Sequence, residues 1–217
     1  MDMNAAREMM LKQQIRAWDV LDDDVLDLIA STPREIFVPA PYRQVAFADE
    51  NIPLGHDQIM MSPGTEGRLI QALCLKPNDK ILEVGTGSGY LTALLAKASH
   101  HVYSVEIYED FLTSAKAKLA QLAITNVTLK AGNAVIGWVE QQPYDVICLT
   151  GSLPRLPKTL RYQLNIGGRL FAVLGNHPMM EAILVVRTDE SSWQTQFLFE
   201  TNVPRLLYGP SESTFLF

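Results

Sequence analysis

A glycine-rich segment is the part of this sequence with the clearest chemical use. Glu83-Val84-Gly85-Thr86-Gly87-Ser88-Gly89-Tyr90 stands between a short apolar run that predicts a strand and a run that predicts a helix. Glycines in a strand-to-helix turn let the backbone approach a ligand closely and present unpaired amides to it. A dinucleotide fingerprint would place its third glycine at position 90, where Tyr90 stands. The segment therefore predicts a binding site for a ligand other than a dinucleotide.

Two further positions fall at the carboxyl ends of predicted strands, where ligands of open α/β sheets gather. Glu106 ends the next predicted strand and is followed by Ile107, and its carboxylate can accept hydrogen bonds from both hydroxyls of a ribose. After the third strand comes Gly132-Asn133-Ala134, in which the side-chain oxygen of Asn133 can accept a hydrogen bond. Alone, these features could be a solvated strand end and a plain turn. Together with the glycine turn they predict one cofactor site.

The elements that must position these residues alternate along the chain from residue 65 onward. Alternating strands and helices predict right-handed crossovers and a parallel sheet covered on both faces. The last two strands, joined by residues 188–192, predict an antiparallel hairpin. The predicted strands are Lys80–Val84, Val102–Val105, Val127–Leu129, Asp145–Leu149, Arg169–Leu174, Ala182–Arg187 and Trp193–Glu200, and the predicted helices are a first one from Thr65 to about Leu73, then Leu91–Ala98, Glu109–Leu122 and Leu156–Leu164.

The N-terminal part has a different pattern. Residues 1–30 are expected to be helical, with Asp22-Asp23-Asp24 capping a second short helix. An irregular stretch rich in Pro and Gly follows as far as Pro63, and a long segment of this kind is usually functional, here as a lid or substrate wall. We expect residues 1–64 to form a helical and loop cover within the same folding unit as a ligand-binding domain over residues 65–217.

The glycine turn, with an acid two residues before its first glycine, is similar to motif I of class I methyltransferases. This resemblance implies S-adenosylmethionine as the cofactor and a Rossmann-like α/β fold. It also implies that the corner at Asn133, where these enzymes commonly carry an acid, receives the adenine amino group through the side-chain oxygen. The expected fold is a mostly parallel seven-stranded sheet with helices on both faces, a C-terminal antiparallel hairpin and the N-terminal helical cover. A nicotinamide-linked dehydrogenase is disfavoured by Tyr90 and by the terminal hairpin.

Further segments are Gln13-Gln14-Ile15-Arg16, Pro33-Arg34-Glu35-Ile36-Phe37-Val38-Pro39, Pro53-Leu54-Gly55-His56-Asp57-Gln58, Leu82 to Tyr90, Tyr144-Asp145 and Gln163 to Leu170. The first three lie outside the general motifs, and together the segments resemble the protein-L-isoaspartate O-methyltransferases over roughly residues 7 to 175. The resemblance implies methyl esterification of isoaspartyl residues in damaged proteins, after which the ester can cyclise and reopen. A carboxylate acceptor is already ionised at neutral pH, so no general base is required and no catalytic residue is predicted.

The predicted substrate loop departs from the family pattern. Where the family has Thr-Ile-Ser, this chain has Ile59, Met60 and Met61, and Ser62 follows one residue late. His56 is a further candidate for substrate contact, with a structural role as the alternative. The apolar residues could line an adaptable pocket or could simply be buried. Two other functions therefore stay open, a methyltransferase for a different acceptor and a cofactor-binding protein without catalysis.

Composition limits the remaining possibilities. The net charge of −6 and the absence of a basic run argue against nucleic-acid binding. No apolar run approaches the roughly 20 residues that span a bilayer, so we expect no membrane partner and a cytoplasmic protein. Only two cysteines are present, Cys74 and Cys148, and we interpret both as core residues and expect no metal site.

Overall fold

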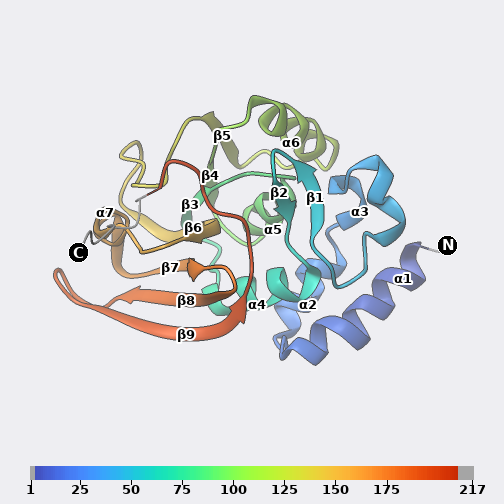
Figure 1. Ribbon diagram of the computed structural model, residues 1–217, viewed down its shortest axis with the longest axis horizontal. Coiled ribbons are helices and arrows are strands. Elements are labelled where there is room, and N and C mark those ends of the chain that lie inside the picture. The colour runs from blue at the N-terminus through green and yellow to red at the C-terminus, as the bar shows by residue number, and fades with distance from the viewer. Residues whose placement is uncertain (1–2, 210–217) are drawn as a thin grey trace.

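The computed structural model describes residues 3–209, and a seven-stranded sheet forms its centre (Figure 1). The strand order is β5-β4-β3-β6-β7-β8-β9, with parallel pairing from β5 to β7 and antiparallel pairing of β7 with β8 and of β8 with β9. The predicted sheet and its terminal hairpin are thereby confirmed. The strands are β3 (Lys80–Val84), β4 (His101–Glu106), β5 (Val127–Ala131), β6 (Tyr144–Leu153), β7 (Leu164–Asn176), β8 (Met179–Arg187) and β9 (Trp193–Thr201).

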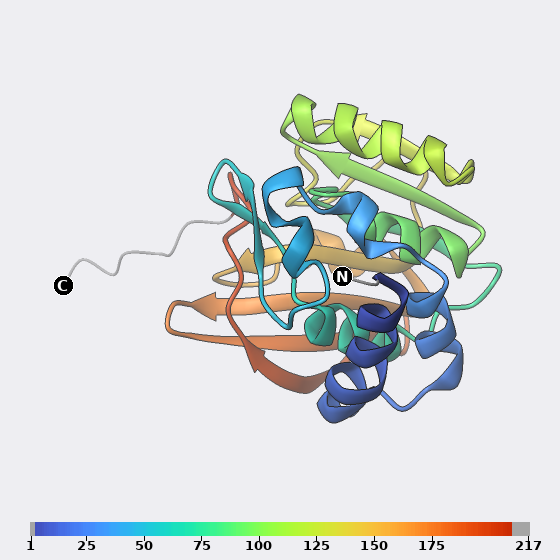
Figure 2. The ribbon, with the colours of Figure 1, turned by 90° about the vertical axis from the view of Figure 1, so that its right-hand side faces the viewer.

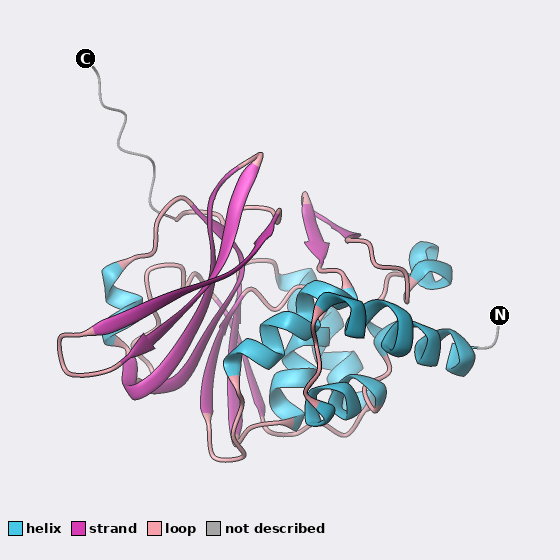
Figure 3. Ribbon diagram, turned by 90° about the horizontal axis from the view of Figure 1, so that it is seen from below, coloured by secondary structure: helices cyan, strands magenta, loops and turns pink. Residues whose placement is uncertain are grey.

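The sheet is buried on both faces because apolar side chains continue through each central strand. In β6, Val146 and Cys148 belong to one buried cluster and Ile147 and Leu149 to another on the opposite face. Burying a side chain of this size contributes about 1.5–3 kcal/mol. Figure 3 shows most helices on one side of the sheet and a single short helix on the other. The helices are α4 (Pro63–Leu73), α5 (Tyr90–Lys97) and α6 (Glu109–Gln121) on the first side and α7 (Lys158–Tyr162) on the second.

The N-terminal residues form the predicted helical cover. Asp22 caps α2 by accepting hydrogen bonds from the amides of Asp24 and Val25. The cover packs in the same buried cluster as α4 and α5, to which it contributes Met10 and Ile15. Figure 2 shows the N-terminal helical segments on the side of the molecule that faces the viewer, in front of the sheet. Its helical segments are α1 (Met3–Met9), a π-helical turn (Met10–Ile15), a 3₁₀ turn (Arg16–Trp18), α2 (Asp23–Ala30), α3 (Arg34–Phe37) and a second 3₁₀ stretch (Ala40–Val45).

The expectation of an irregular segment up to Pro63 is wrong. Besides the second 3₁₀ stretch, it contains a small antiparallel sheet of β1 (Ile52–Gly55) and β2 (Gln58–Met60). Gly55, His56 and Asp57 all adopt positive φ, which makes the tight turn between the two strands. This β1–β2 hairpin replaces the expected loop with a segment of defined backbone pairing.

Two smaller expectations also need correction. The helix expected over Leu156–Leu164 begins only after Pro157 and ends before Gln163, because Leu164 already pairs with Tyr144 as the first residue of β7. Cys74 is exposed rather than in the core, since it ends α4 in a left-handed conformation, whereas Cys148 is fully buried. No helix in the described residues is long and apolar enough to cross a membrane. Residues 1–2, at the start of the predicted cover, and residues 210–217, at the end of the predicted ligand-binding domain, lie outside the described residues.

Candidate functional site

A cavity lies at the carboxyl ends of β3, β4, β5 and β6, between the sheet and the β1–β2 hairpin. Its empty space is about 830 Å³ with the open mouth included, within the range of ~300–1,000 Å³ typical of small-molecule sites. The predicted site residues that line it are Gly85, Thr86, Gly87, Ser88, Glu106, Ile107, Gly132, Asn133, Ile59, Met60 and Met61. Segments far apart in the sequence therefore meet at one place, as the strand topology requires.

Two glycines of the turn are required both by their backbone conformation and by the neighbouring residues that pack closely against them. Gly85 has a φ of +98°, and a β-carbon there would lie 2.2 Å from the Thr150 hydroxyl oxygen. That hydroxyl donates to the carbonyl oxygens of Val84 and Gly85, at 2.9 and 2.8 Å. Gly89 caps α5 at a φ of +85°, and a β-carbon there would lie 2.9 Å from that of Ala115. Both positions require glycine because neighbouring elements occupy the space of a side chain.

Glu106 is held in place by backbone amides. Its Oε1 accepts hydrogen bonds from the amides of Ile107 and Tyr108, at 2.8 and 3.1 Å, and its Oε2 accepts one from Gly87 at 2.9 Å. The carboxylate is nearly buried, and it joins the glycine turn after β3 to the loop after β4. An oxygen with two acceptor positions that uses one of them can still receive a ligand hydroxyl. Oε2 is therefore the oxygen best placed to bind a ribose.

Glu83 and Tyr90 flank the turn, but neither lines the cavity in the described part of the chain. Glu83 accepts hydrogen bonds from the hydroxyls of Ser104 and Thr92, at 2.5 and 2.6 Å, behind the turn. Tyr90 is buried, with the Arg34 guanidinium 5.0 Å from its ring centre. Both side chains support the turn from the protein interior.

Burial raises the pKa of Glu83 from 4.5 to about 8, because the charged form loses its hydration; the Ser104 and Thr92 hydroxyls oppose this rise. A carboxyl group that binds its proton more tightly in the folded state stabilises the fold fully below pH ~4.5. That stabilisation is lost as the pH rises through about 8.

We therefore expect Glu83→Gln to flatten the fall in the free energy of unfolding between pH 5.5 and 8.5. Each unit of pKa difference corresponds to ~1.4 kcal/mol, so the two slopes should separate clearly in urea denaturation. Glu109→Gln, at an exposed position, is the matched control and should keep the wild-type slope. Parallel pH profiles for wild type and Glu83→Gln would contradict this account of Glu83.

The corner after β5 carries Asn133 at the cavity wall. Its Oδ1 accepts a hydrogen bond from the amide of Val135 at 3.0 Å, which fixes the side chain in a local turn. One acceptor position of that oxygen remains, as the predicted contact with an adenine amino group requires. Ala134 and Val135, next in the chain, are buried and add an apolar surface to the same wall.

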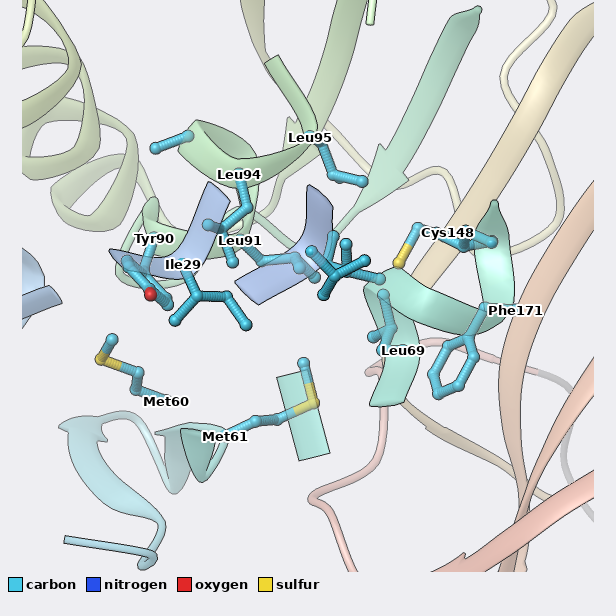
Figure 4. Packing of buried hydrophobic residues seen from close by; sticks show 14 of the residues in the cluster. Ile29, Met60, Met61, Leu69, Tyr90, Leu91, Leu94, Leu95, Cys148 and Phe171 are labelled. Atoms are coloured by element: carbon cyan, nitrogen blue, oxygen red, sulfur yellow. The ribbon is translucent and has the colours of Figure 1, made fainter. Parts of the chain in front are cut away.

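The predicted substrate loop divides into wall residues and supporting residues. Met60 and Met61 are buried in the core and also line the cavity, so the two alternatives for these residues are true together; Figure 4 shows them in the cluster with Leu91 and Ile29. Ser62 does not line this cavity in the described residues, and its hydroxyl instead accepts a hydrogen bond from the Thr65 amide as the cap of α4.

His56 also lies outside the residues that line the cavity. Its ring stacks on Tyr108 at 4.0 Å between ring centres, and its Nε2 lies 3.1 Å from the Asp110 carboxylate. The Asp110 pKa is lowered, first by the hydrogen bond from His56. These contacts fasten the tip of the β1–β2 hairpin to the start of α6.

A buried ion pair beneath the substrate loop was not predicted. Arg34 donates to the Glu66 carboxylate, to the Met61 carbonyl oxygen at 2.6 Å and to the Ala46 carbonyl oxygen at 2.9 Å. Both charged side chains are almost fully buried, and Glu66 lines the cavity. Burial raises the pKa of Glu66, and the Arg34 charge opposes that rise. The pair fixes the backbone of the loop whose side chains form the cavity wall.

The remaining wall residues were not predicted. Gln58, Val84 and Ala134 belong to segments already singled out in the sequence, whereas most of the others come from segments without a recognisable motif. Tyr108 and Phe111 follow Glu106, where proximity to the predicted carboxylate could have suggested them. Thr150 and Gly151 end β6, and the segment 204–207 passes the same end of that strand. The wall residues outside the prediction are Gln58, Glu66, Val84, Leu91, Val105, Tyr108, Phe111, Ala134, Val135, Thr150, Gly151, Pro204, Arg205, Leu206 and Leu207.

Comparison with known proteins agrees with this geometry. The model of the protein-L-isoaspartate(D-aspartate) O-methyltransferase family matches residues 5–203. Protein-L-isoaspartate O-methyltransferase 2 of Pelobacter propionicus is 36% identical over 181 residues, which cover 83% of this chain and 80% of that protein. The Syntrophus aciditrophicus protein-L-isoaspartate O-methyltransferase is 37% identical over 181 residues, 83% of each chain.

Solved structures share the fold. A protein-L-isoaspartate O-methyltransferase structure aligns with a TM-score of 0.78 at 24% identity over 92% of this chain, which spans only 65% of that longer chain. A Plasmodium falciparum protein described as an enzyme of the same kind, in complex with S-adenosyl-L-homocysteine, aligns with a TM-score of 0.76 at 20% identity, covering 92% of this chain and 97% of that one. From the family match and the identity to its relatives, the chain belongs to the S-adenosylmethionine-dependent protein-L-isoaspartate(D-aspartate) O-methyltransferase family that its sequence resembles.

Proposed function

We propose that this chain transfers the methyl group of S-adenosylmethionine to the isoaspartyl carboxylate of damaged proteins. The observation that carries the proposal is the composition of one cavity. The family glycine turn and Glu106 form one wall, and the loop from Ile59 to Met61 forms another. A cofactor held by the first wall would present its methyl group to an acceptor admitted past the second.

The residues present fit this cofactor. The backbone from Gly85 to Ser88 lines the cavity without bulky side chains at its glycines, and Oε2 of Glu106 has an acceptor position for a ribose hydroxyl. Ile107, Tyr108 and Val135 offer apolar and aromatic surface for an adenine ring. Asn133 retains one acceptor position for the adenine amino group.

When bound, S-adenosylmethionine supplies an electrophilic methyl group on a sulfonium. The chain must align an acceptor carboxylate with that group and exclude water, and it need not move a proton, because a carboxyl group with a pKa near ~4 is ionised at neutral pH. The buried walls formed by Met60, Met61 and Leu91 lower the hydration of both reactants. Binding and orientation are therefore the chemical roles of these side chains.

Glu106→Gln is expected to weaken S-adenosylmethionine binding roughly 10- to 100-fold. The substitution keeps the shape of the side chain but turns one acceptor oxygen into a donor, which must face either a backbone amide or the ribose hydroxyl. An unmatched buried group costs ~1–3 kcal/mol. Isothermal titration calorimetry measures the affinity, with Glu109→Gln as the control in the neighbouring helix. Wild-type affinity in Glu106→Gln would rule out this carboxylate as a ribose ligand.

The function is tested by transfer of labelled methyl to a peptide that contains isoaspartate, beside the same peptide with ordinary aspartate. We expect labelling of the isoaspartyl peptide alone, with one base-labile ester formed for each cofactor consumed. A folded preparation that binds S-adenosylmethionine but labels neither peptide would overturn the substrate assignment and leave the cofactor assignment intact.

The apolar wall favours a second candidate, a methyltransferase for a different and less polar acceptor. Ile59 and Met61 stand where the family pattern has hydroxyls that could orient an anion. The triple variant Ile59→Thr, Met60→Ile, Met61→Ser restores that pattern. Isoaspartyl activity in this variant but not in the wild type would establish that the natural chain has changed its acceptor. If the cofactor binds and no acceptor in a panel of carboxylates, amines and hydroxyls is methylated, a role without catalysis follows.

We further propose that the partners of this chain are damaged proteins or peptides rather than nucleic acid, and that residues 1–64 and 65–217 act as one unit in the cytoplasm. The negative net charge supports the first point, and two cysteines without a disulfide suit a reducing compartment. The common buried cluster of the cover and α4 supports the second. Limited proteolysis that released a stable fragment starting near residue 65 would contradict a single unit.

A further inference from the structure

The cofactor cavity opens beside a second, more exposed groove, and the two share part of their walls. The shared residues are Ile59, Pro204 and Arg205. The rest of the groove is largely polar and includes Asn51, Asn202 and His177. A peptide that lay in this groove could direct one side chain past Ile59 and Arg205 into the cavity.

Arg205 brings a permanent positive charge to this boundary. Among the described residues that line either space it is the one Lys or Arg side chain. The two carboxylates of the cavity wall already have partners, since Glu66 pairs with Arg34 and Glu106 accepts three amides. In the described residues no carboxylate lies within ion-pair distance of the Arg205 guanidinium. Its charge is therefore available to a ligand.

The backbone that carries Arg205 is fixed to the end of β6. Ser152 donates its amide to the Pro204 carbonyl oxygen at 2.8 Å and accepts the Leu206 amide at 3.0 Å, so that both neighbours of Arg205 are tied to one residue. The Ser152 hydroxyl also donates to the Val203 carbonyl oxygen at 3.0 Å. A side chain at Gly151 would place its β-carbon 2.8 Å from the Pro204 oxygen, which shows how closely the segments approach. The backbone at Arg205 is thus held at a fixed point beside the cavity, and its side chain is exposed there.

We propose that Arg205 binds the acceptor carboxylate at the mouth of the cavity; this rests on the proposed isoaspartyl function. An anion that moves against Ile59, Met60 and Met61 loses hydration without gaining hydrogen-bond donors from them. A guanidinium can hold one carboxylate oxygen by a charge-assisted hydrogen bond while the other oxygen faces the methyl group. Arg205 would then supply the polar contact that the apolar loop lacks.

The charge balance of the reaction agrees with such a role. A lone pair of the carboxylate oxygen forms the new O–CH₃ bond, and the electrons of the breaking C–S⁺ bond remain on sulfur. An anion and a cation become a neutral ester and a neutral thioether, and no proton moves. Arg205 would bind the ionised acceptor more strongly than the ester, which favours exchange of product for substrate.

Arg205 follows residue 203, the last one matched by the family model. The contact is therefore inferred from the position of this side chain in the structure and not from the part of the chain that defines the family. It assigns an acceptor-binding role to a residue that neither the motifs nor the substrate loop indicated.

The test compares binding of three fluorescent peptides in the presence of S-adenosyl-L-homocysteine. One contains isoaspartate, one has the same residue with its free carboxylate converted to a carboxamide, and one contains aspartate. We expect wild type to prefer the carboxylate peptide over the carboxamide peptide by roughly 10- to 100-fold. Arg205→Met should bring this ratio close to one, and Arg205→Lys should keep part of it.

Two controls separate the possible failures. Arg155→Met removes another exposed arginine, which does not line either space, and should keep the wild-type ratio. Cofactor affinity, measured separately, should be unchanged in Arg205→Met. A wild type that methylates isoaspartate while Arg205→Met retains its ratio and its KM for the peptide would overturn the proposal for Arg205. A wild type that binds cofactor but neither binds nor methylates the isoaspartyl peptide would instead overturn the proposed function.

Discussion

Gly85→Ala is expected to weaken S-adenosylmethionine binding roughly 100-fold or more, because the new side chain would clash with Thr150 and would also strain the backbone. The new β-carbon would lie 2.2 Å from the Thr150 hydroxyl oxygen, far inside van der Waals contact. Thr150 cannot yield freely, because its hydroxyl donates to the Val84 and Gly85 carbonyl oxygens. The turn must therefore move at the place where the backbone approaches the cofactor, and binding geometry tolerates little displacement.

Gly167→Ala is the matched control for this effect. Gly167 also has a positive φ, +81°, but no atom lies within 4 Å of the added β-carbon. Both variants carry the cost of a left-handed alanine, ~1–2 kcal/mol, and only Gly85→Ala adds the contact with Thr150. The double variant Gly85→Ala, Thr150→Ala removes the clashing hydroxyl and should recover part of the affinity measured by calorimetry. Equal affinities for Gly85→Ala and Gly167→Ala would contradict this explanation.

The fold could be predicted from the sequence because its signals are local. The alternation of strands and helices fixes the parallel sheet, and the glycine turn and Glu106 fall at strand ends that the topology brings together. The β1–β2 hairpin was missed because its turn uses His56 and Asp57 at positive φ. These residue types carry a much weaker turn signal than the Asn-Gly or Asp-Gly pairs usual in short hairpins.

The sequence predicts where the cofactor turn lies better than which of its side chains face the ligand. Glu83 and Tyr90 belong to the motif, yet in the structure their side chains contact the interior, Glu83 through Thr92 and Ser104 and Tyr90 through Arg34. Side-chain direction at a strand-to-helix turn depends on the elements packed behind it. No spacing rule within the motif contains that information.

The remaining wall residues depend on contacts between distant segments. Thr150 is 65 residues away in the sequence from Gly85, to which it donates a hydrogen bond, and Arg34 is 32 residues away from its partner Glu66. Arg205 arrives beside the cavity only because its segment pairs with Ser152 at the end of β6. Each of these residues, read alone, is an ordinary polar or charged side chain. Its role depends on which distant segments the folded chain brings together, and it could not be predicted from the residues next to it in the sequence.

The buried pair of Arg34 and Glu66 leads to the largest expected effect on stability. Arg34→Met should lower the free energy of unfolding by about 3–5 kcal/mol, because it leaves the Glu66 charge buried without a partner. It also removes the donors to the Met61 and Ala46 carbonyl oxygens. Lys12→Met, which breaks the exposed pair with Glu8, is the control and should cost no more than ~1 kcal/mol.

The pH dependence of this loss identifies its cause. Without Arg34, nothing opposes the effect of burial, which raises the pKa of Glu66 in the folded state. A raised pKa means that stability is retained at low pH and lost as the pH rises, so Arg34→Met should be more destabilised at pH 8 than at pH 5 in urea denaturation. The double variant Arg34→Met, Glu66→Gln removes the unpaired charge and should recover stability at pH 8. A loss that is the same at both pH values and persists in the double variant would show that the two carbonyl contacts, rather than the ion pair, hold the loop. Arg34 donates to the carbonyl oxygen of Met61, and Met61 also lines the cavity. With either outcome, the contacts that stabilise this region are therefore also the ones that hold the wall of the acceptor site in place.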